Sequence, residues 1–227
     1  MPRKPRMFVA GTPCHVIQRG NNRSVCFFEA QNYQFYLHCL NEACRRYDVA
    51  LHAYVLMTNH IHLLMTPSEQ TGVSRVMQSI GRRYVQYINS RYNRTGTLFE
   101  GRFKASLVQQ DAYFLMCMRY IELNPVRANM VLTPAQYTWS SFHENTGMAT
   151  RHLVRPHYVY LALASEHTSV EQSYLSLFEN EMTIKQVSEI TNAWQFNMPY
   201  GSKRFLNEIE LTLNRRIGFA KKGRPAN

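Results

Sequence analysis

The pattern of apolar positions along the first part of the chain predicts four strands. Short runs of apolar side chains, rich in β-branched and aromatic residues, occur at 13–19, 49–57, 60–65 and 103–109. Thr58 and Asn59 separate the second run from the third. They predict a two-residue hairpin turn, because Asn tolerates the left-handed conformation that such turns require. The second and third runs are therefore expected to pair as antiparallel strands.

Between these strands, apolar residues recur at spacings of three and four and predict three helices. The helices are expected over 29–47, from after Pro67 to about Tyr92, and from Asp111 to Pro125. Asp111 is a residue type that caps helix N-termini, and proline stops the third helix. This order predicts an α+β fold, a ferredoxin-like antiparallel sheet with the helices on one face.

After about Thr133 the pattern changes, and the rest of the chain is expected to be mainly helical. An aromatic segment at 137–142 is expected to pack back onto the core, and Thr183 and Ser202 predict the starts of two further helices. Residues 158–210 carry seven acidic and three basic side chains, whereas residues 211–227 carry five basic ones and no acidic one. We therefore predict a core domain at 1–145 and a helical C-terminal appendage with a basic tail at 146–227.

The charge balance indicates a polyanionic partner. Lys and Arg number 26 against 15 Asp and Glu, a formal net charge of +11, while 45% hydrophobic residues are enough for a packed core. Twenty of the 26 basic residues are Arg, whose planar guanidinium suits phosphate groups and base edges. Seven basic residues and one acidic residue lie between Arg75 and Lys104, so this segment is expected to contact nucleic acid. A solvated helix face is the alternative.

Local composition argues against several other classes of protein. The longest uncharged stretch, 49–68, has polar residues at its centre and does not predict a transmembrane helix. The N-terminus lacks the features of a signal peptide, so a cytoplasmic location is expected. The five cysteines form no Cys-x-x-Cys pair, which favours reduced, buried thiols over zinc sites or disulfides.

Two pairs of polar residues indicate a metal-dependent catalytic site. His60 and His62 lie two apart on a predicted strand, so both imidazoles point to one face and can bind the same ion. A lone His-x-His pair is also common among surface residues. Tyr120 and Asn124 lie four apart on the third predicted helix and share a face. The Asn124 amide oxygen would complete a ligand set for Mg²⁺ or Mn²⁺, with Tyr120 as the nucleophile.

The same residues lie in motifs that carry a resemblance to a known family. The motifs are HVIQRGNN at 15–22, MTNHIHLL at 57–64, LFEGRFK at 98–104 and RYIELNPVRA at 119–128. Over roughly 13–142 the chain resembles the REP-associated tyrosine transposases, which belong to the HUH single-tyrosine transposases and are similar to insertion-sequence single-strand transposases. The chain departs from many relatives at two positions, with Thr58 in place of Pro and Asn129 in place of Gly.

The resemblance implies a metal-dependent enzyme that binds single-stranded DNA with REP-like palindromic hairpins. It would cleave one strand through a 5′-phosphotyrosine and rejoin it, as a monomer or homodimer, and would be nucleoid-associated when bound to DNA. His60 and His62 match the family's metal ligands, Tyr120 its catalytic tyrosine, and Asn124 the residue that completes coordination of Mg²⁺ or Mn²⁺. No nucleotide cofactor is expected, because one phosphodiester replaces another of similar energy.

Candidate DNA contacts are basic or polar side chains near these motifs and in the basic tail. They are Arg19, Asn59, Arg82, Arg83, Arg102, Lys104, Arg127, Arg215, Arg216, Lys221, Lys222 and Arg224. Residues 222–225, Lys-Gly-Arg-Pro, resemble a hook that enters narrow minor grooves, and a disordered basic terminus is the alternative. Two other functions stay open at this point. One is a catalytically silent nucleic-acid-binding protein on the same fold, and the other a metal-dependent phosphodiesterase that uses water and does not need Tyr120.

Overall fold

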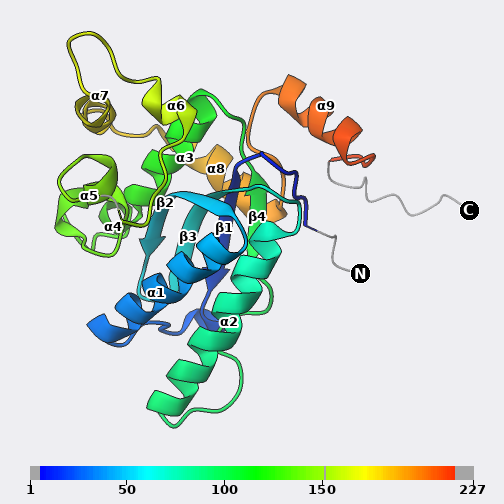
Figure 1. The fold of residues 1–227 in the computed structure, drawn as a ribbon, viewed down its shortest axis with the longest axis vertical. Coiled ribbons are helices and arrows are strands. Elements are labelled where there is room, and N and C mark those ends of the chain that lie inside the picture. The colour runs from blue at the N-terminus through cyan, green and yellow to red at the C-terminus, as the bar shows by residue number, and fades with distance from the viewer. Residues whose placement is uncertain (1–5, 151, 218–227) are drawn as a thin grey trace, which may run out of the picture.

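The computed structural model describes residues 6–150 and 152–217. Its centre is an antiparallel sheet of four strands in the order β2-β3-β1-β4 (Figure 1). The strands are β1 (Cys14–Arg19), β2 (Val49–Leu56), β3 (His60–Pro67) and β4 (Lys104–Leu107). The four strands predicted from the apolar runs are thus confirmed.

Strands β2 and β3 form the predicted hairpin, which closes through a hydrogen bond from the Met57 N–H to the His60 carbonyl, 2.8 Å. The connection covers Met57, Thr58 and Asn59. Neither Thr58 nor Asn59 adopts a positive φ, so the left-handed turn predicted here is wrong. The register, with Leu56 opposite Ile61, and the hydrogen bond from Met57 to His60 leave Thr58 and Asn59 as the two residues of the turn as predicted, so only the turn conformation differs. Asn129, which replaces the glycine of many relatives, does adopt a φ of 54°.

Three helices occupy the predicted positions: α1 (Ala30–Arg46), α2 (Gly72–Arg91) and α3 (Ala112–Glu122). The Asp111 carboxylate caps α3 as predicted, accepting a hydrogen bond from the Tyr113 N–H at 2.9 Å. Helices α1 and α2 cover one face of the sheet and α3 covers the other (Figure 1). The α+β class and the antiparallel sheet are therefore confirmed, whereas the placement of all helices on one face is wrong.

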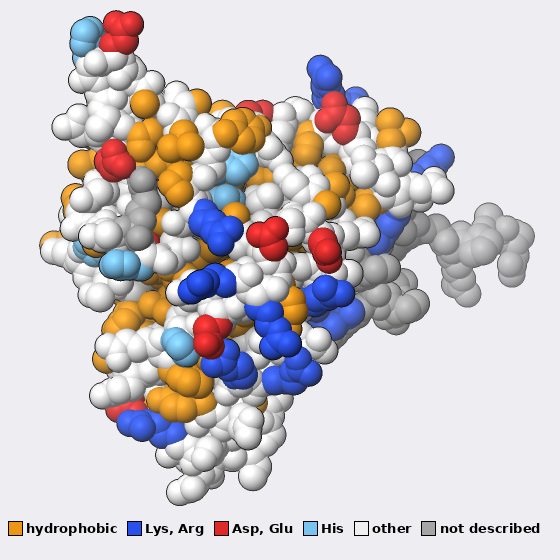
Figure 2. Space-filling view, in the orientation of Figure 1, with side chains coloured by type: hydrophobic (Ala, Val, Ile, Leu, Met, Phe, Trp, Pro, Cys, Tyr) orange, Lys and Arg blue, Asp and Glu red, His pale blue; other side chains and the backbone are white. Residues whose placement is uncertain are grey.

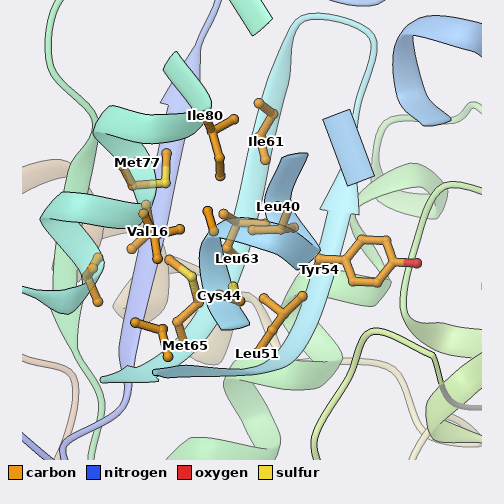
Figure 3. Packing of buried hydrophobic residues seen from close by; sticks show 14 of the residues in the cluster. Val16, Leu40, Cys44, Leu51, Tyr54, Ile61, Leu63, Met65, Met77 and Ile80 are labelled. Atoms are coloured by element: carbon orange, nitrogen blue, oxygen red, sulfur yellow. The ribbon is translucent and has the colours of Figure 1, made fainter. Parts of the chain in front are cut away.

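The burial of the strands explains why helices cover both faces. Ile61 and Leu63 of β3 pack with α1 and α2 (Figure 3), whereas Leu64 packs in a second cluster with α3. Along β2 nearly every side chain is buried. A continuous apolar strand of this kind is typical of a sheet covered on both sides, while a sheet with one solvent face alternates.

The remaining helical elements are short except near the C-terminus. They are η1 (Asn21–Arg23), α4 (Asn124–Arg127), η2 (Pro134–Gln136), α5 (Phe142–Asn145), α6 (Tyr158–Leu161), α7 (Val170–Ser176), α8 (Ile184–Phe196) and α9 (Lys203–Thr212). The predicted starts of α8 and α9 are confirmed. The Thr183 hydroxyl accepts from the Gln186 N–H and the Ser202 hydroxyl from the Phe205 N–H, both at 3.2 Å.

Segments distant in sequence cover both edges of the sheet. Beyond β2, the Leu56 N–H donates to the Trp139 carbonyl at 2.9 Å, and the Trp139 ring stacks on Tyr33 with a centroid distance of 4.6 Å. The aromatic segment at 137–142 thus packs onto the core as predicted. Beyond β4, the Tyr200 N–H donates to the Leu107 carbonyl at 2.7 Å. Covered edges protect the sheet from pairing with other chains.

The C-terminal segment shares a core with the sheet. Tyr160, Tyr174 and Trp194 pack in the same cluster as Phe114 and Ile121 of α3. This packing holds α8 against the face of the sheet that α3 covers. The division of the chain into 1–145 and 146–227 stays a prediction.

Two expectations from composition can be compared with the structure. All five cysteines are buried and unpaired, as predicted. Within residues 6–150 and 152–217, no helix has the length and apolar character needed to cross a membrane.

Candidate active site

His60 and His62 lie on the face of β3 that points towards α3 and α8. Their rings are neighbours, with centroids 5.1 Å apart and planes at 78°. Residue Ile61 between them points into the opposite core, as the period of two in a strand requires. The predicted pair of imidazoles on one face is therefore what the structure contains.

Each of the two histidines has its Nδ1 occupied by a neighbour. The Asn59 amide oxygen lies 2.7 Å from Nδ1 of His60, and Nε2 of His15 lies 2.9 Å from Nδ1 of His62. An amide oxygen only accepts, so the His60 Nδ1 carries the proton and its Nε2 carries the lone pair. Among the hydrogen bonds of residues 6–150 and 152–217, none involves Nε2 of His60 or His62.

Burial keeps the three imidazoles neutral. It lowers the pKa of His60 to about 4, with the positive charge of Arg19 adding to the shift. It lowers the pKa of His15 to about 3 and holds the pKa of His62 well below its usual range. The neutral form is the one that can bind a metal ion through a ring nitrogen.

Tyr120 of α3 lies beside these rings. Its side chain is only 3% exposed, and its ring meets those of His15 and His62 edge to face, with centroids 5.8 Å and 5.9 Å away. The Arg127 guanidinium lies over the tyrosine ring, 4.6 Å from its centroid. The structure thus places the predicted nucleophile beside His62, whose ring is in turn the neighbour of His60.

Asn124 begins α4, directly after the helix that carries Tyr120. Its Nδ2 donates to the carbonyls of Tyr120 at 2.8 Å and Ile121 at 3.3 Å, which fixes the amide group. The amide oxygen takes part in none of the hydrogen bonds of the described residues. It is therefore available as a ligand.

The residues present fit a divalent ion. Two imidazoles whose Nε2 atoms make no hydrogen bond within the described residues, with an amide oxygen such as that of Asn124, are nitrogen and oxygen donors of the kind that suits Mn²⁺ and is compatible with Mg²⁺. Within the described ranges, no group of three or more His, Cys, Asp or Glu side chains could hold a metal ion.

Helix α8 closes this site from the C-terminal side. The Tyr120 hydroxyl lies 3.2 Å from Oγ1 of Thr191 and accepts a hydrogen bond from the Trp194 indole N–H at 3.3 Å. Sequence reasoning missed both α8 residues. They lie about 70 positions after Tyr120, and no local pattern indicates a contact over that separation.

The C-terminal end of α8 is held to β4 by hydrogen bonds. The Lys104 ammonium donates to the Gln195 carbonyl at 3.2 Å, and the Ala105 N–H donates to the Asn197 amide oxygen at 3.2 Å. The Ser106 hydroxyl donates to the Met198 carbonyl at 2.5 Å. These contacts explain why α8 lies across the sheet at this point.

A basic groove extends from the site along β1 and β4. Its volume is about 650 Å³, and Arg19, Arg102 and Lys104 line it together with Trp194. Arg19 pairs with His60 across β1 and β3, so the groove begins beside the first metal ligand. Burial and the charge of Arg19 lower the pKa of Lys104. Three of the predicted DNA contacts are therefore on the same face as Tyr120.

Arg82 and Arg83 lie elsewhere, on α2 and thus on the far side of the sheet from Tyr120. Figure 2 shows Lys and Arg side chains gathered on the face that α1 and α2 form. Arg83 is ion-paired there with Glu42 at 2.5 Å, and its side chain is exposed rather than turned to the core. The basic segment predicted as one patch is thus divided between two faces.

The other predicted contacts occupy varied positions. Both polar atoms of the Asn59 side chain are engaged, Oδ1 with His60 and Nδ2 with the Arg23 carbonyl at 3.0 Å. Arg215 and Arg216 follow the end of α9. Lys221, Lys222 and Arg224, with the Lys-Gly-Arg-Pro segment, lie outside the described residues.

Comparison with known proteins places this chain in a family. Residues 9–124 match the family described as IS200-like transposases. The fold is similar to that of a REP-associated tyrosine transposase bound to a REP hairpin, with a TM-score of 0.57 and 18% sequence identity, over 70% of this chain and 93% of that chain. A candidate transposase from Deinococcus radiodurans R1 has a TM-score of 0.37 and 17% identity, over 57% of this chain and 92% of that one. No curated protein sequence matches.

The family match covers more than half of the 227 residues. It begins before β1 and ends at Asn124, so it contains His60, His62 and Tyr120 as well as Asn124. The chain belongs to the IS200-like transposase family.

Proposed function

We propose that this transposase is a metal-dependent enzyme that nicks and rejoins single-stranded DNA through Tyr120. Its DNA carries a palindromic hairpin in this proposal, and the REP-associated transposase of similar fold is bound to a REP hairpin. His60, His62 and Asn124 hold Mg²⁺ or Mn²⁺ in this proposal. The groove lined by Arg19, Arg102 and Lys104 receives the strand.

One observation carries the proposal: a tyrosine hydroxyl lies in the same buried site as two histidines whose Nε2 atoms are available. A phosphodiesterase that uses water has no need of a tyrosine in this position. A silent DNA-binding protein has no need of two neutral imidazoles whose Nε2 atoms make no hydrogen bond within the described residues. The combination is the one that a tyrosine nucleophile requires.

The chain's own residues define the reaction. The Tyr120 oxygen attacks phosphorus, the bond to the 3′ oxygen breaks, and the products are a 5′-phosphotyrosine and a free 3′-OH. A bound divalent ion supplies charge stabilisation at the phosphate oxygens. A different 3′-OH that attacks the phosphotyrosine releases Tyr120 and joins two strands, with no input of ATP.

A covalent adduct tests the proposal. A hairpin oligonucleotide taken from palindromes beside the gene, labelled at its 3′ end, is incubated with the protein and Mn²⁺. We expect a labelled protein band on a denaturing gel, because the 5′-phosphate of the labelled fragment stays on Tyr120. The same oligonucleotide with a scrambled stem is the control and should give no band. Binding without cleavage would support the silent protein, and cleavage without a band would support attack by water.

We expect Arg102→Ala to weaken the binding of a short single strand of DNA. The slope of the logarithm of the binding constant against the logarithm of the salt concentration should become shallower by about 0.7. Arg102 lines the groove beside the site, so its removal leaves one phosphate unneutralised. Arg82→Ala is the matched control, since it removes the same exposed charge from the far face. It should leave the slope for the short strand unchanged.

The same titration with a full hairpin tests the predicted contact of Arg82 with duplex DNA. If Arg82 makes that contact, Arg82→Ala should make the salt slope for the hairpin shallower by about 0.9. Equal effects of both variants on the short strand would contradict the assignment of the groove. In that case total charge, and not position, would determine the affinity.

A further inference from the structure

We propose that His15 is a positioning residue that fixes the proton of His62 on Nδ1 and so presents Nε2 of His62 to the metal ion. The inference rests on the proposed function, in which His62 is a ligand. It assigns a role to a histidine of β1 that lies outside the His60-Ile61-His62 motif.

The sheet places the two rings together. His15 pairs with Leu64 and Ile17 with His62, so His15 and His62 are diagonal neighbours on one face of adjacent strands. Their rings are stacked at 25° with centroids 5.1 Å apart, and Nε2 of His15 lies 2.9 Å from Nδ1 of His62. The side chains are 1% and 2% exposed, so water does not compete for this hydrogen bond.

The shared proton admits two arrangements, because both rings are neutral. In the first, Nε2 of His15 donates to Nδ1 of His62, and the proton of His62 is then on Nε2, where it blocks a metal ion. In the second, Nδ1 of His62 donates to Nε2 of His15, and Nε2 of His62 keeps its lone pair. Only the second arrangement is compatible with binding a metal ion at Nε2.

His60 has a similar arrangement, in which a neighbouring side chain holds its proton on Nδ1. Its Nδ1 donates to the Asn59 amide oxygen, which can only accept. Asn59 therefore does for His60 what His15 does for His62. Partners of this kind orient metal-binding histidines, and their loss typically costs about 10- to 100-fold in metal affinity.

Three substitutions at His15 separate hydrogen bonding from packing. His15→Gln places an amide near the position of Nε2 and can still accept from Nδ1 of His62. His15→Phe keeps the bulk of the ring and removes the acceptor. His15→Asn keeps an amide but is too short to reach Nδ1. His52→Phe is a control, because His52 is another buried histidine of the sheet that bonds to Thr66 and the Arg155 carbonyl instead.

The main measurement is the affinity of the DNA-free protein for Mn²⁺, from the loss of the free-ion signal in electron paramagnetic resonance. We expect His15→Gln to bind within about threefold of the unmodified protein. His15→Phe and His15→Asn should bind about 10- to 100-fold more weakly, and His52→Phe should show no change. An unchanged affinity for Mn²⁺ in His15→Phe would overturn the proposal and show that His15 only fills space in the core. An equal loss in His15→Gln would overturn it in favour of direct coordination by the His15 imidazole.

Nitrogen NMR of the metal-free protein gives a second readout that does not depend on any variant folding. We expect the proton of His62 on Nδ1 in the unmodified chain, and a proton on Nε2 would overturn the proposal. A failure of the proposed function looks different. The protein would then show these metal affinities and tautomers while forming no covalent adduct with DNA.

Discussion

Tyr120→Phe should abolish both strand cleavage and the covalent DNA adduct, with a loss of roughly 10³-fold or more in single-turnover cleavage of a labelled hairpin. The substitution removes one oxygen atom, which is the proposed nucleophile. The hydroxyl also meets Thr191 at 3.2 Å and Trp194 at 3.3 Å, so its removal should cost about 1 kcal/mol of stability. Mn²⁺ affinity and hairpin affinity should therefore remain near their original values.

Tyr113→Phe provides the matched control. Tyr113 lies two turns earlier on α3, where its ring packs edge to face on Tyr200 with centroids 5.0 Å apart, and it lines a separate cavity beside α8. This variant should cleave normally. An adduct on Tyr113 in the Tyr120→Phe protein would contradict the assignment of the nucleophile. Cleavage by Tyr120→Phe without any adduct would contradict the tyrosine mechanism itself.

Glu122→Gln should stabilise the protein by about 3 kcal/mol at pH 8 and have little effect at pH 4. The Glu122 carboxyl is fully buried and accepts hydrogen bonds from Ser141 at 2.5 Å, Asn145 at 2.8 Å and Tyr174 at 2.9 Å. Burial outweighs these three donors and raises the pKa of Glu122 from 4.5 to about 7. The carboxyl is thus easier to protonate in the folded chain than in the unfolded chain.

The direction of the pH effect follows from this shift. Below pH 4.5 both states hold the proton, and the contribution of Glu122 to stability is complete. As the pH rises towards 7, the unfolded state loses its proton first and the contribution is lost. Glutamine resembles the protonated carboxyl and does not titrate. Urea unfolding from pH 4 to 8 gives the free energy of unfolding of the original protein and of Glu122→Gln, and the effects of other titrating groups cancel in the difference between the two. A difference that does not change with pH would show that Glu122 is not the group responsible.

Local patterns in the sequence predicted the elements and the two pairs of site residues. His60 and His62 share a face because a strand has a period of two, and Tyr120 and Asn124 share one because a helix has a period near four. Asp111, Thr183 and Ser202 cap helices because their side-chain oxygens accept from nearby N–H groups. Each of these inferences depends on residues within a few positions of one another.

The errors and omissions concern contacts across the fold. The position of α8 depends on its packing against β4 and α3, and nothing near Thr191 or Trp194 in sequence indicates it. The basic residues from Arg75 to Lys104 looked like one patch, yet the sheet lies between Arg82 and Arg102. The role inferred for His15 needs the register of β1 with β3, which no local spacing shows.

Helix α8 also has a consequence for measured affinities. It belongs to the same chain as Tyr120, lies beyond the segment that matches the family, and occupies the space in front of the hydroxyl. Under the proposed function, α8 is one wall of the groove that receives the strand, because Trp194 and Gln195 line it together with Arg19. Substitutions in 184–196 should therefore change the measured Kd for DNA, although these residues lie outside the segment that matches the family.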